Sequence, residues 1–126
     1  MKGKKFATAL NCMDGRVQLP VIEFLKKKYK VDFVDMITEP GIDKLLGEGE
    51  KETIDRIKKK IEISVKKHGS QIVAIIGHTD CAGNPVGEKE HFCYIRKGKE
   101  ILESMNLGVE ILGLWVNKDW KVEIVA

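Results

Sequence analysis

The residues best suited to chemistry lie in two short segments that each follow an apolar run. Cys12, Asp14 and Arg16 occur in the segment CMDGR, and His78 and Cys81 occur in the segment HTDC. Thiolate sulfur and imidazole nitrogen are ligands that suit zinc. A His-x-x-Cys pair alone is weak evidence, because a loop histidine beside a half-buried thiol gives the same pattern. Together, the two segments predict one metal site with Cys12, His78 and Cys81 as its ligands.

Two strands are needed to bring these segments together. Lys4 to Asn11 is predicted to form the first strand, and Ile72 to Gly77 a later one. The later run shows no polar alternation, which is typical of a strand covered on both faces of a parallel sheet. The carboxyl ends of neighbouring parallel strands meet at one edge of the sheet, where ligands usually bind. We therefore expect these two strands to be neighbours.

The rest of the chain alternates helix and strand patterns. The clearest amphipathic helix runs from Glu50 to His68, and its apolar positions are spaced by three, four and four residues: Ile54, Ile57, Ile61 and Val65. Gly69 is its expected stop. Ile42 to Gly49 is expected to be a loop with a short helical turn. The other predicted elements are the helices Gln18–Tyr29 and Glu88–Met105 and the strands Val31–Ile37, Val109–Val116 and Trp120–Val125.

This alternation predicts an α/β fold with three layers. We expect a mostly parallel sheet of order 2-1-3-4, right-handed crossovers, an antiparallel fifth strand at one edge, and helices on both faces. A chain of 126 residues is the usual size of one domain, so a single domain over residues 1–126 is predicted.

Composition argues against several classes of protein. Lys and Arg total 22 and Asp and Glu total 19, interleaved through the helices, and only 6% of residues are aromatic. Nucleic acid is therefore not an expected partner. The apolar run near the N-terminus, Phe6 to Leu10, is shorter than a signal-peptide core or a membrane span. No membrane association is therefore expected. Three cysteines, an odd number, favour reduced thiols and a cytoplasmic location.

The two motifs resemble the Cys-x-Asp-x-Arg and His-x-x-Cys motifs of the β-class carbonic anhydrases, in the same order and over almost the whole chain. The resemblance implies a Zn²⁺ ion held by Cys12, His78 and Cys81. It also implies reversible hydration of carbon dioxide to bicarbonate, with zinc-bound hydroxide as the nucleophile. The predicted strand order is that of the family core, and a homodimer or higher homo-oligomer is implied as well.

Asp14 and Arg16 allow two states of such a site. The Asp14 carboxylate either becomes the fourth zinc ligand or stays outside and accepts a hydrogen bond from bound hydroxide. A bidentate pair with Arg16 would hold it off the metal. The resemblance implies that the Asp14–Arg16 pair acts as a gate, as it does in the family. The enzyme is active when the two residues are paired, and the aspartate completes the zinc coordination when the pair is broken. An ordinary loop ion pair is the plainer interpretation.

The sequence departs from the family pattern in three places. Gly15 stands where the family often has serine. Thr38, Glu39, Pro40 and Gly41 correspond to an Arg-Asn-Ala-Gly type of segment, and a negative Glu39 facing the pocket would disfavour bicarbonate. The chain also begins almost directly with its first strand, so the N-terminal arm that embraces a partner in many members is not expected. These departures indicate a short, divergent member.

Three other functions are compatible with parts of the sequence. One is a non-catalytic zinc protein or regulator in which Asp14 is permanently the fourth ligand. Another is hydrolysis of carbonyl sulfide or carbon disulfide at the same zinc. In a third, Cys12 is the nucleophile of a phosphatase or sulfurtransferase loop, although that loop is short and carries acidic or bulky residues. On the helix Glu88–Met105, His91 is expected to face solvent and Cys93 to be core or half-buried.

Overall fold

Five strands form a single sheet in the computed structural model, which describes residues 3–126; residues 1–2 of the predicted domain lie outside this range. The sheet order is β2-β1-β3-β4-β5. The strands are β1 (Phe6–Asn11), β2 (Phe33–Thr38), β3 (Ile72–His78), β4 (Glu110–Val116) and β5 (Val122–Ile124). The first four are parallel, and β5 runs antiparallel to β4. The predicted order and the antiparallel edge strand are both confirmed.

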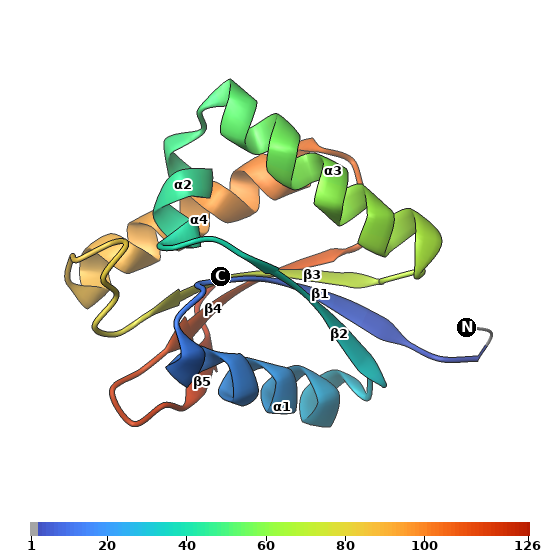
Figure 1. Cartoon of the computed structure of the whole chain (residues 1–126), viewed down its shortest axis with the longest axis horizontal. Coiled ribbons are helices and arrows are strands. Elements are labelled where there is room, and N and C mark those ends of the chain that lie inside the picture. Colours follow the sequence, from blue (N-terminus) through green and yellow to red (C-terminus); the bar gives the residue numbers. More distant parts are fainter. Residues whose placement is uncertain (1–2) are drawn as a thin grey trace.

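Helices cover both faces of this sheet, as predicted (Figure 1). Helix α1 (Gln18–Tyr29) packs on one face, and α2 (Ile42–Glu48), α3 (Lys51–Lys67) and α4 (Glu88–Ser104) pack on the other. A short 3₁₀ turn, η1 (Gly15–Val17), precedes α1. Within residues 3–126, none of the helices combines the length and apolar character needed to cross a bilayer.

The central strand β3 explains the three-layer arrangement. Ala74 and Ile76 belong to the apolar core on the α1 side, whereas Val73 and Ile75 belong to the core beneath α2, α3 and α4. Successive side chains of a strand point to opposite faces, so both sets must be apolar when both faces are covered. All seven residues of β3 are buried.

The segment expected to be mainly loop forms the two-turn helix α2. Ile42 and Leu46, four residues apart, are fully buried on one side of it. Gly41 and Gly49 flank the helix in left-handed conformations, with φ of 59° and 72°. The expectation of a loop with a short helical turn is therefore wrong in extent: the glycines begin and end a helix instead of preventing one.

Two expectations for α4 are also wrong. His91 is completely buried, and Cys93 is exposed. The buried stripe of the helix consists of His91, Ile95, Gly98 and Leu102, spaced by four, three and four residues. Position 93 lies half a turn away from this stripe, which explains why its thiol faces solvent.

Candidate metal centre

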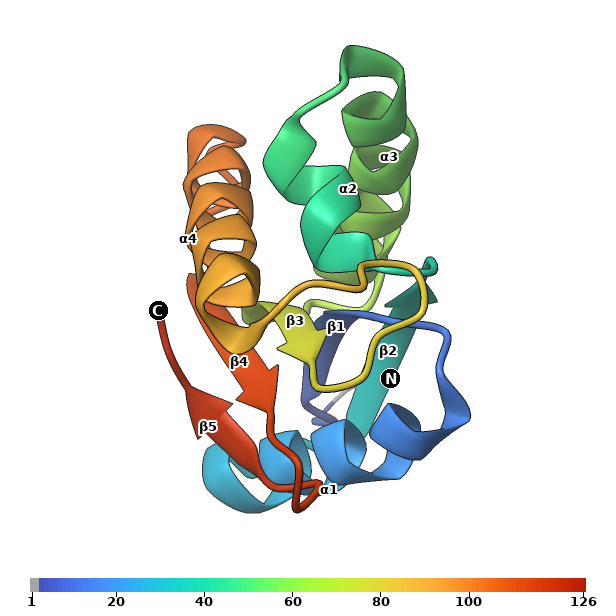
Figure 2. The same cartoon turned by 90° about the vertical axis from the view of Figure 1, so that its left-hand side faces the viewer.

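The carboxyl ends of β1 and β3 lie side by side because Thr8, Ala9 and Leu10 pair in parallel with three successive residues of β3. The loops that follow these strands turn toward each other, and Figure 2 shows the loop after β3 crossing the start of α2. The potential ligand atoms of Cys12, His78 and Cys81 all lie within 4.8 Å of one another, and the three residues are buried. The structure therefore brings the three predicted ligands together.

The geometry of this cluster fits a tetrahedral metal ion. The sulfurs of Cys12 and Cys81 are 3.9 Å apart, and two zinc–sulfur bonds of ~2.3 Å at a tetrahedral angle place sulfurs roughly 3.8 Å apart. Nδ1 of His78 donates to the carbonyl of Thr79 at 2.6 Å. That leaves Nε2 as the lone-pair nitrogen, and it is buried without a hydrogen-bond partner among residues 3–126. A buried nitrogen without a partner is expected where it serves as a ligand.

Without a metal, the two thiols share a proton unequally. The hydrogen bond from Cys81 lowers the pKa of Cys12, with help from the backbone amides of Gly41 and Asp14, although burial opposes the shift. The same hydrogen bond, together with burial, raises the pKa of Cys81. Cys12 is therefore the thiolate of the pair, and metal binding must displace the proton that Cys81 carries.

Two side chains shape the loop that carries Cys12. Asn11 accepts a hydrogen bond from the Cys12 amide at 2.9 Å and donates to the carbonyl of Val17 at 3.1 Å. Gln18 donates to the carbonyls of Cys12 at 2.7 Å and Asp14 at 3.1 Å. Sequence reasoning did not identify these two residues. A polar Asn11 at the end of a largely apolar run was the available signal.

Asp14 and Arg16 form the bidentate pair that an open site requires. Nη2 of Arg16 donates to Oδ2 of Asp14 at 2.6 Å and Nε donates to Oδ1 at 3.0 Å, while the Arg16 amide also donates to Oδ1 at 2.9 Å. The hydrogen bonds from Arg16 lower the pKa of Asp14 to about 2. Among the described residues, the Asp14 carboxylate is not part of the three-ligand cluster.

The Arg16 side chain is held from two further directions. Nη1 donates to a carboxylate oxygen of Asp80 and Nη2 to its backbone carbonyl, both at 3.1 Å. The guanidinium carbon also lies 4.8 Å from the ring centroid of Trp120, a cation–π contact. Neither Asp80 nor Trp120 was identified from the sequence. Trp120 gave no signal, because it lies 104 positions from Arg16 (120 minus 16) in the turn before β5.

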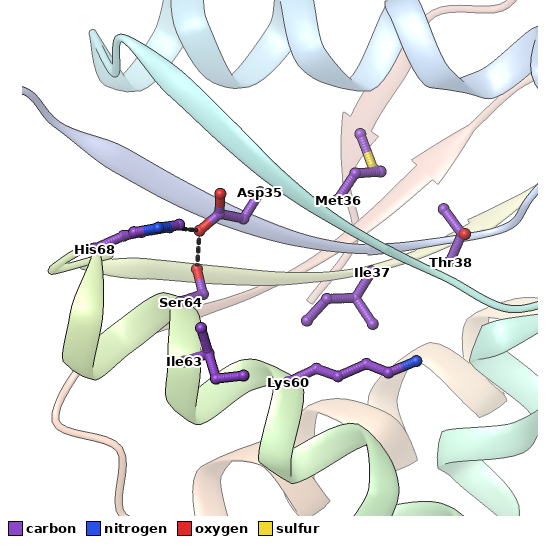
Figure 3. Close-up of a pocket in the computed structure, with 8 residues that line it drawn as sticks. All are labelled: Asp35, Met36, Ile37, Thr38, Lys60, Ile63, Ser64 and His68. Atoms are coloured by element: carbon purple, nitrogen blue, oxygen red, sulfur yellow. Dashed lines mark hydrogen bonds and ion pairs between the residues drawn. The ribbon is translucent and has the colours of Figure 1, made fainter.

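A separate cavity of about 360 Å³ lies between β2 and α3 (Figure 3). Asp35 is central to it and accepts hydrogen bonds from Ser64 and His68, each at 2.6 Å. None of the predicted site residues lines this cavity. It is therefore distinct from the cluster at the carboxyl ends of β1 and β3.

Comparison with known proteins places nearly the whole chain in a family. Residues 2–126 match a family described as "Putative carbonic anhydrase". The chain belongs to this carbonic anhydrase family. The predicted family resemblance is thereby confirmed over nearly the whole chain. No curated protein sequence matched the chain.

Solved carbonic anhydrases share the fold of this family member. A carbonic anhydrase from Glaciozyma antarctica superposes with a TM-score of 0.63 at 16% identity, covering 94% of this chain and 81% of that one. A β-carbonic anhydrase isoform of Trichomonas vaginalis gives 0.59 at 16% identity, with coverage of 96% and 80%. A β-carbonic anhydrase of Aspergillus fumigatus gives 0.52 at 16% identity, with coverage of 98% and 78%. At this identity the likeness establishes the shared fold.

The structure also clarifies two departures of this carbonic anhydrase family member from the expected motif. A Cβ at Gly15 would meet nothing within 4 Å, so the serine common in the family would fit there. The Glu39 carboxylate forms a short ion pair with Arg56 and lies 3.9 Å from Lys60. Its negative charge is therefore compensated by α3.

Proposed function

We propose that this protein catalyses the reversible hydration of carbon dioxide to bicarbonate with one Zn²⁺ ion held by Cys12, His78 and Cys81. One observation carries the proposal: a buried Cys-His-Cys cluster lies beside a bidentate Asp14–Arg16 pair in a member of a carbonic anhydrase family. When bound, zinc supplies hydroxide near neutral pH by lowering the pKa of a coordinated water.

The three ligand side chains suit a catalytic metal better than a purely structural one. Structural zinc sites usually have four protein ligands, whereas catalytic sites have three and keep one position for water. Two thiolates and a neutral imidazole also balance the double charge of the ion. The hydrogen bond from Nδ1 of His78 to the Thr79 carbonyl, and those that Asn11 and Gln18 make with the Cys12 backbone, fix the orientation of the ligands.

Asp14 and Arg16 are assigned the role of a gate. Arg16 engages both Asp14 oxygens and so keeps the carboxylate away from the ligand cluster. Oδ2, whose close donor is Nη2 of Arg16, retains a lone pair that can accept a hydrogen bond from a water beside the cluster, which would orient that water for attack on carbon dioxide. The pairing favours the open state over an account in which Asp14 is permanently the fourth ligand.

The same contacts weigh against Cys12 as the nucleophile of a phosphatase loop. Such a loop needs a free guanidinium and small residues around a bound oxyanion. Here Arg16 is engaged by Asp14 and Asp80, and both carboxylates would repel an anion. The compensated charge of Glu39, in contrast, is compatible with bicarbonate as product.

We extend the proposal to the whole chain, with residues 1–126 as one zinc domain that works in the cytoplasm as a homodimer or larger homo-oligomer. Met13 and Leu19, on either side of the gate, are 62% and 61% exposed. Large apolar side chains exposed beside a candidate site support a covering partner subunit. Buried thiols at Cys12 and Cys81 support a reducing compartment.

The test is carbon dioxide hydration by stopped flow, with zinc content measured on the same sample at pH about 6 to 9. We expect roughly one zinc per chain and a rate that rises with pH as bound water ionises. The Cys12→Ser variant should lose both zinc and activity. Bound zinc with no hydration at alkaline pH would instead support the non-catalytic protein. Turnover of carbonyl sulfide or carbon disulfide without turnover of carbon dioxide would support the hydrolase.

A further inference from the structure

Three buried polar side chains meet behind the metal centre, and the proposed function leaves them without a role. Asp43 on α2, Asn84 in the loop after β3 and His91 on α4 are 1%, 1% and 0% exposed. Nδ1 of His91 lies 2.6 Å from Oδ2 of Asp43, and Nδ2 of Asn84 donates to Oδ1 of Asp43 at 3.2 Å. Asp43 therefore links elements that are 41 and 48 positions away.

Burying a carboxylate and an imidazole in an apolar core is unfavourable unless they are well paired. Here the pairing centres on Asp43, with one longer contact of 3.4 Å between Nδ2 of Asn84 and Nδ1 of His91. Oδ1 of Asn84 and Nε2 of His91 are buried with no hydrogen-bond partner in the part of the chain that the structure describes. Burying this cluster therefore costs free energy, and apolar side chains packed between the same helices would not carry that cost.

The cluster connects to both thiolate-bearing loops. Asn84 lies three positions after Cys81, and its backbone amide and that of Gly83 lower the pKa of the Cys81 thiol. Gly41 lies two positions before Asp43, and its backbone amide lowers the pKa of the Cys12 thiol. The Asn84–Asp43 hydrogen bond therefore joins the segments that supply these donors.

These segments touch through their backbones. A Cβ at Gly41 would lie 2.6 Å from the carbonyl carbon and oxygen of Gly83, and a Cβ at Gly83 would lie 2.6 Å from the Gly41 nitrogen. A Cβ at Gly77, the residue before His78, would lie 2.8 Å from Oδ2 of Asp43. With so little space, a small shift of Asp43 must move the loops that present the ligands.

We propose that Asp43, Asn84 and His91 are positioning residues that hold the β2–α2 loop against the loop after β3 and thereby set the metal affinity and the donor strength of the two thiolates. None of the three belongs to the Cys12, His78 and Cys81 cluster. This inference rests on metal binding by Cys12, His78 and Cys81, as the proposed function does, but it does not depend on carbon dioxide hydration.

The chain provides a matched control in the Asp35–His68 pair. Its Nδ1–Oδ2 distance is also 2.6 Å, and it joins β2 to the end of α3 (Figure 3). It does not contact the loops that carry the metal ligands. Its side chains are 38% and 25% exposed, so variants of this pair report the cost of breaking a more open histidine–carboxylate contact away from the ligand loops.

The test measures Co²⁺ binding by chelator competition and the thiolate-to-cobalt absorption band in Asn84→Ala, Asp43→Ala and the control Asp35→Ala. We expect Asn84→Ala and Asp43→Ala to bind Co²⁺ about tenfold to hundredfold more weakly and to shift the band. Asp35→Ala should match the wild type. Asp43→Asn should restore most of the affinity, because an amide can accept from Asn84 and donate to His91.

The outcomes separate this inference from the proposed function. Unchanged affinity and absorption in Asn84→Ala would overturn the inference while leaving the metal centre intact. Equal weakening by Asp35→Ala would also overturn it, because the effect would then be general loss of stability. A wild-type protein that binds no Co²⁺ would overturn both proposals. Asn84→Ala removes one buried amide group and leaves the Asp43–His91 contact in place, so the test stands even if Asp43→Ala fails to fold.

Discussion

Arg16 holds Asp14 through Nε at 3.0 Å from Oδ1 and Nη2 at 2.6 Å from Oδ2, while its third nitrogen, Nη1, reaches Asp80 at 3.1 Å. One guanidinium is thus shared between two carboxylates. The bidentate geometry is matched only to Asp14, because a fork of parallel N–H groups fits both oxygens of one carboxylate. The position of Asp14 therefore depends on Arg16.

The first prediction concerns removal of this guanidinium. In Arg16→Ala, Asp14 is free to reach the ligand cluster, so carbon dioxide hydration at neutral pH should fall by about tenfold to hundredfold while zinc stays bound. Arg16→Lys should rescue little, because an ammonium cannot form the bidentate pair. Stopped-flow rates beside metal content provide the measurement. A wild-type rate in Arg16→Ala would remove Asp14 and Arg16 from the account.

The second prediction concerns acid titration. Arg16 lowers the pKa of Asp14 from 3.8 to about 2. Because the folded-state pKa is lowered, the pair stabilises the fold fully above the ordinary value and loses this contribution as pH falls toward about 2. Carbon-13 NMR of the metal-free protein should show Asp14 still ionised at the ordinary carboxyl midpoint, and half-protonated there in Arg16→Ala. Identical titrations in both proteins would show that the pair does not form in solution.

The third prediction concerns Asp80, whose side chain is 81% exposed in its ion pair with Arg16. Exposed pairs contribute little, about 0.2–1 kcal/mol, because water screens them. Asp80→Asn should therefore change the hydration rate by less than about fivefold, far less than Arg16→Ala. A loss as large as that of Arg16→Ala would mean that Asp80 is a true member of the gate.

The fourth prediction concerns the contact between Gly41 and Gly83. Gly41 has a φ of 59°, and its added Cβ would lie 2.6 Å from backbone atoms of Gly83. Gly41→Ala should therefore destabilise the metal-free protein by about 2–4 kcal/mol, through overpacking and a strained conformation. Gly15→Ala, where the Cβ meets nothing within 4 Å, is the control. Urea unfolding measures both, and equal midpoints would refute the close packing of the two loops.

Much of the fold could be predicted from the sequence, because the hydrophobic pattern of single segments and the order of those segments along the chain indicated the same sheet. The unbroken apolar run of β3 predicted a buried strand, and the two cysteine motifs predicted that β1 and β3 are neighbours. The structure confirms the sheet order. The three candidate metal ligands followed from the same argument, since parallel neighbours end at the same edge.

The features that were missed depend on contacts between distant positions. His91 was expected to face solvent because its partner, Asp43, is 48 positions away and lies on a helix that was not fully predicted. A stricter count of the periodicity would have placed His91 with Ile95 and Leu102 on the buried stripe. Trp120 left no local signal, because its contact with Arg16 arises only when the turn before β5 folds back.

The most direct test of the central claim is zinc K-edge X-ray absorption on the zinc-loaded protein. The account predicts two sulfur ligands at ~2.3 Å and two nitrogen or oxygen ligands at ~2.0 Å, one of them an imidazole, with one sulfur lost in Cys12→Ser. A spectrum with fewer than two sulfur ligands in the wild type, or one unchanged by Cys12→Ser, would contradict a zinc ion shared by Cys12, His78 and Cys81.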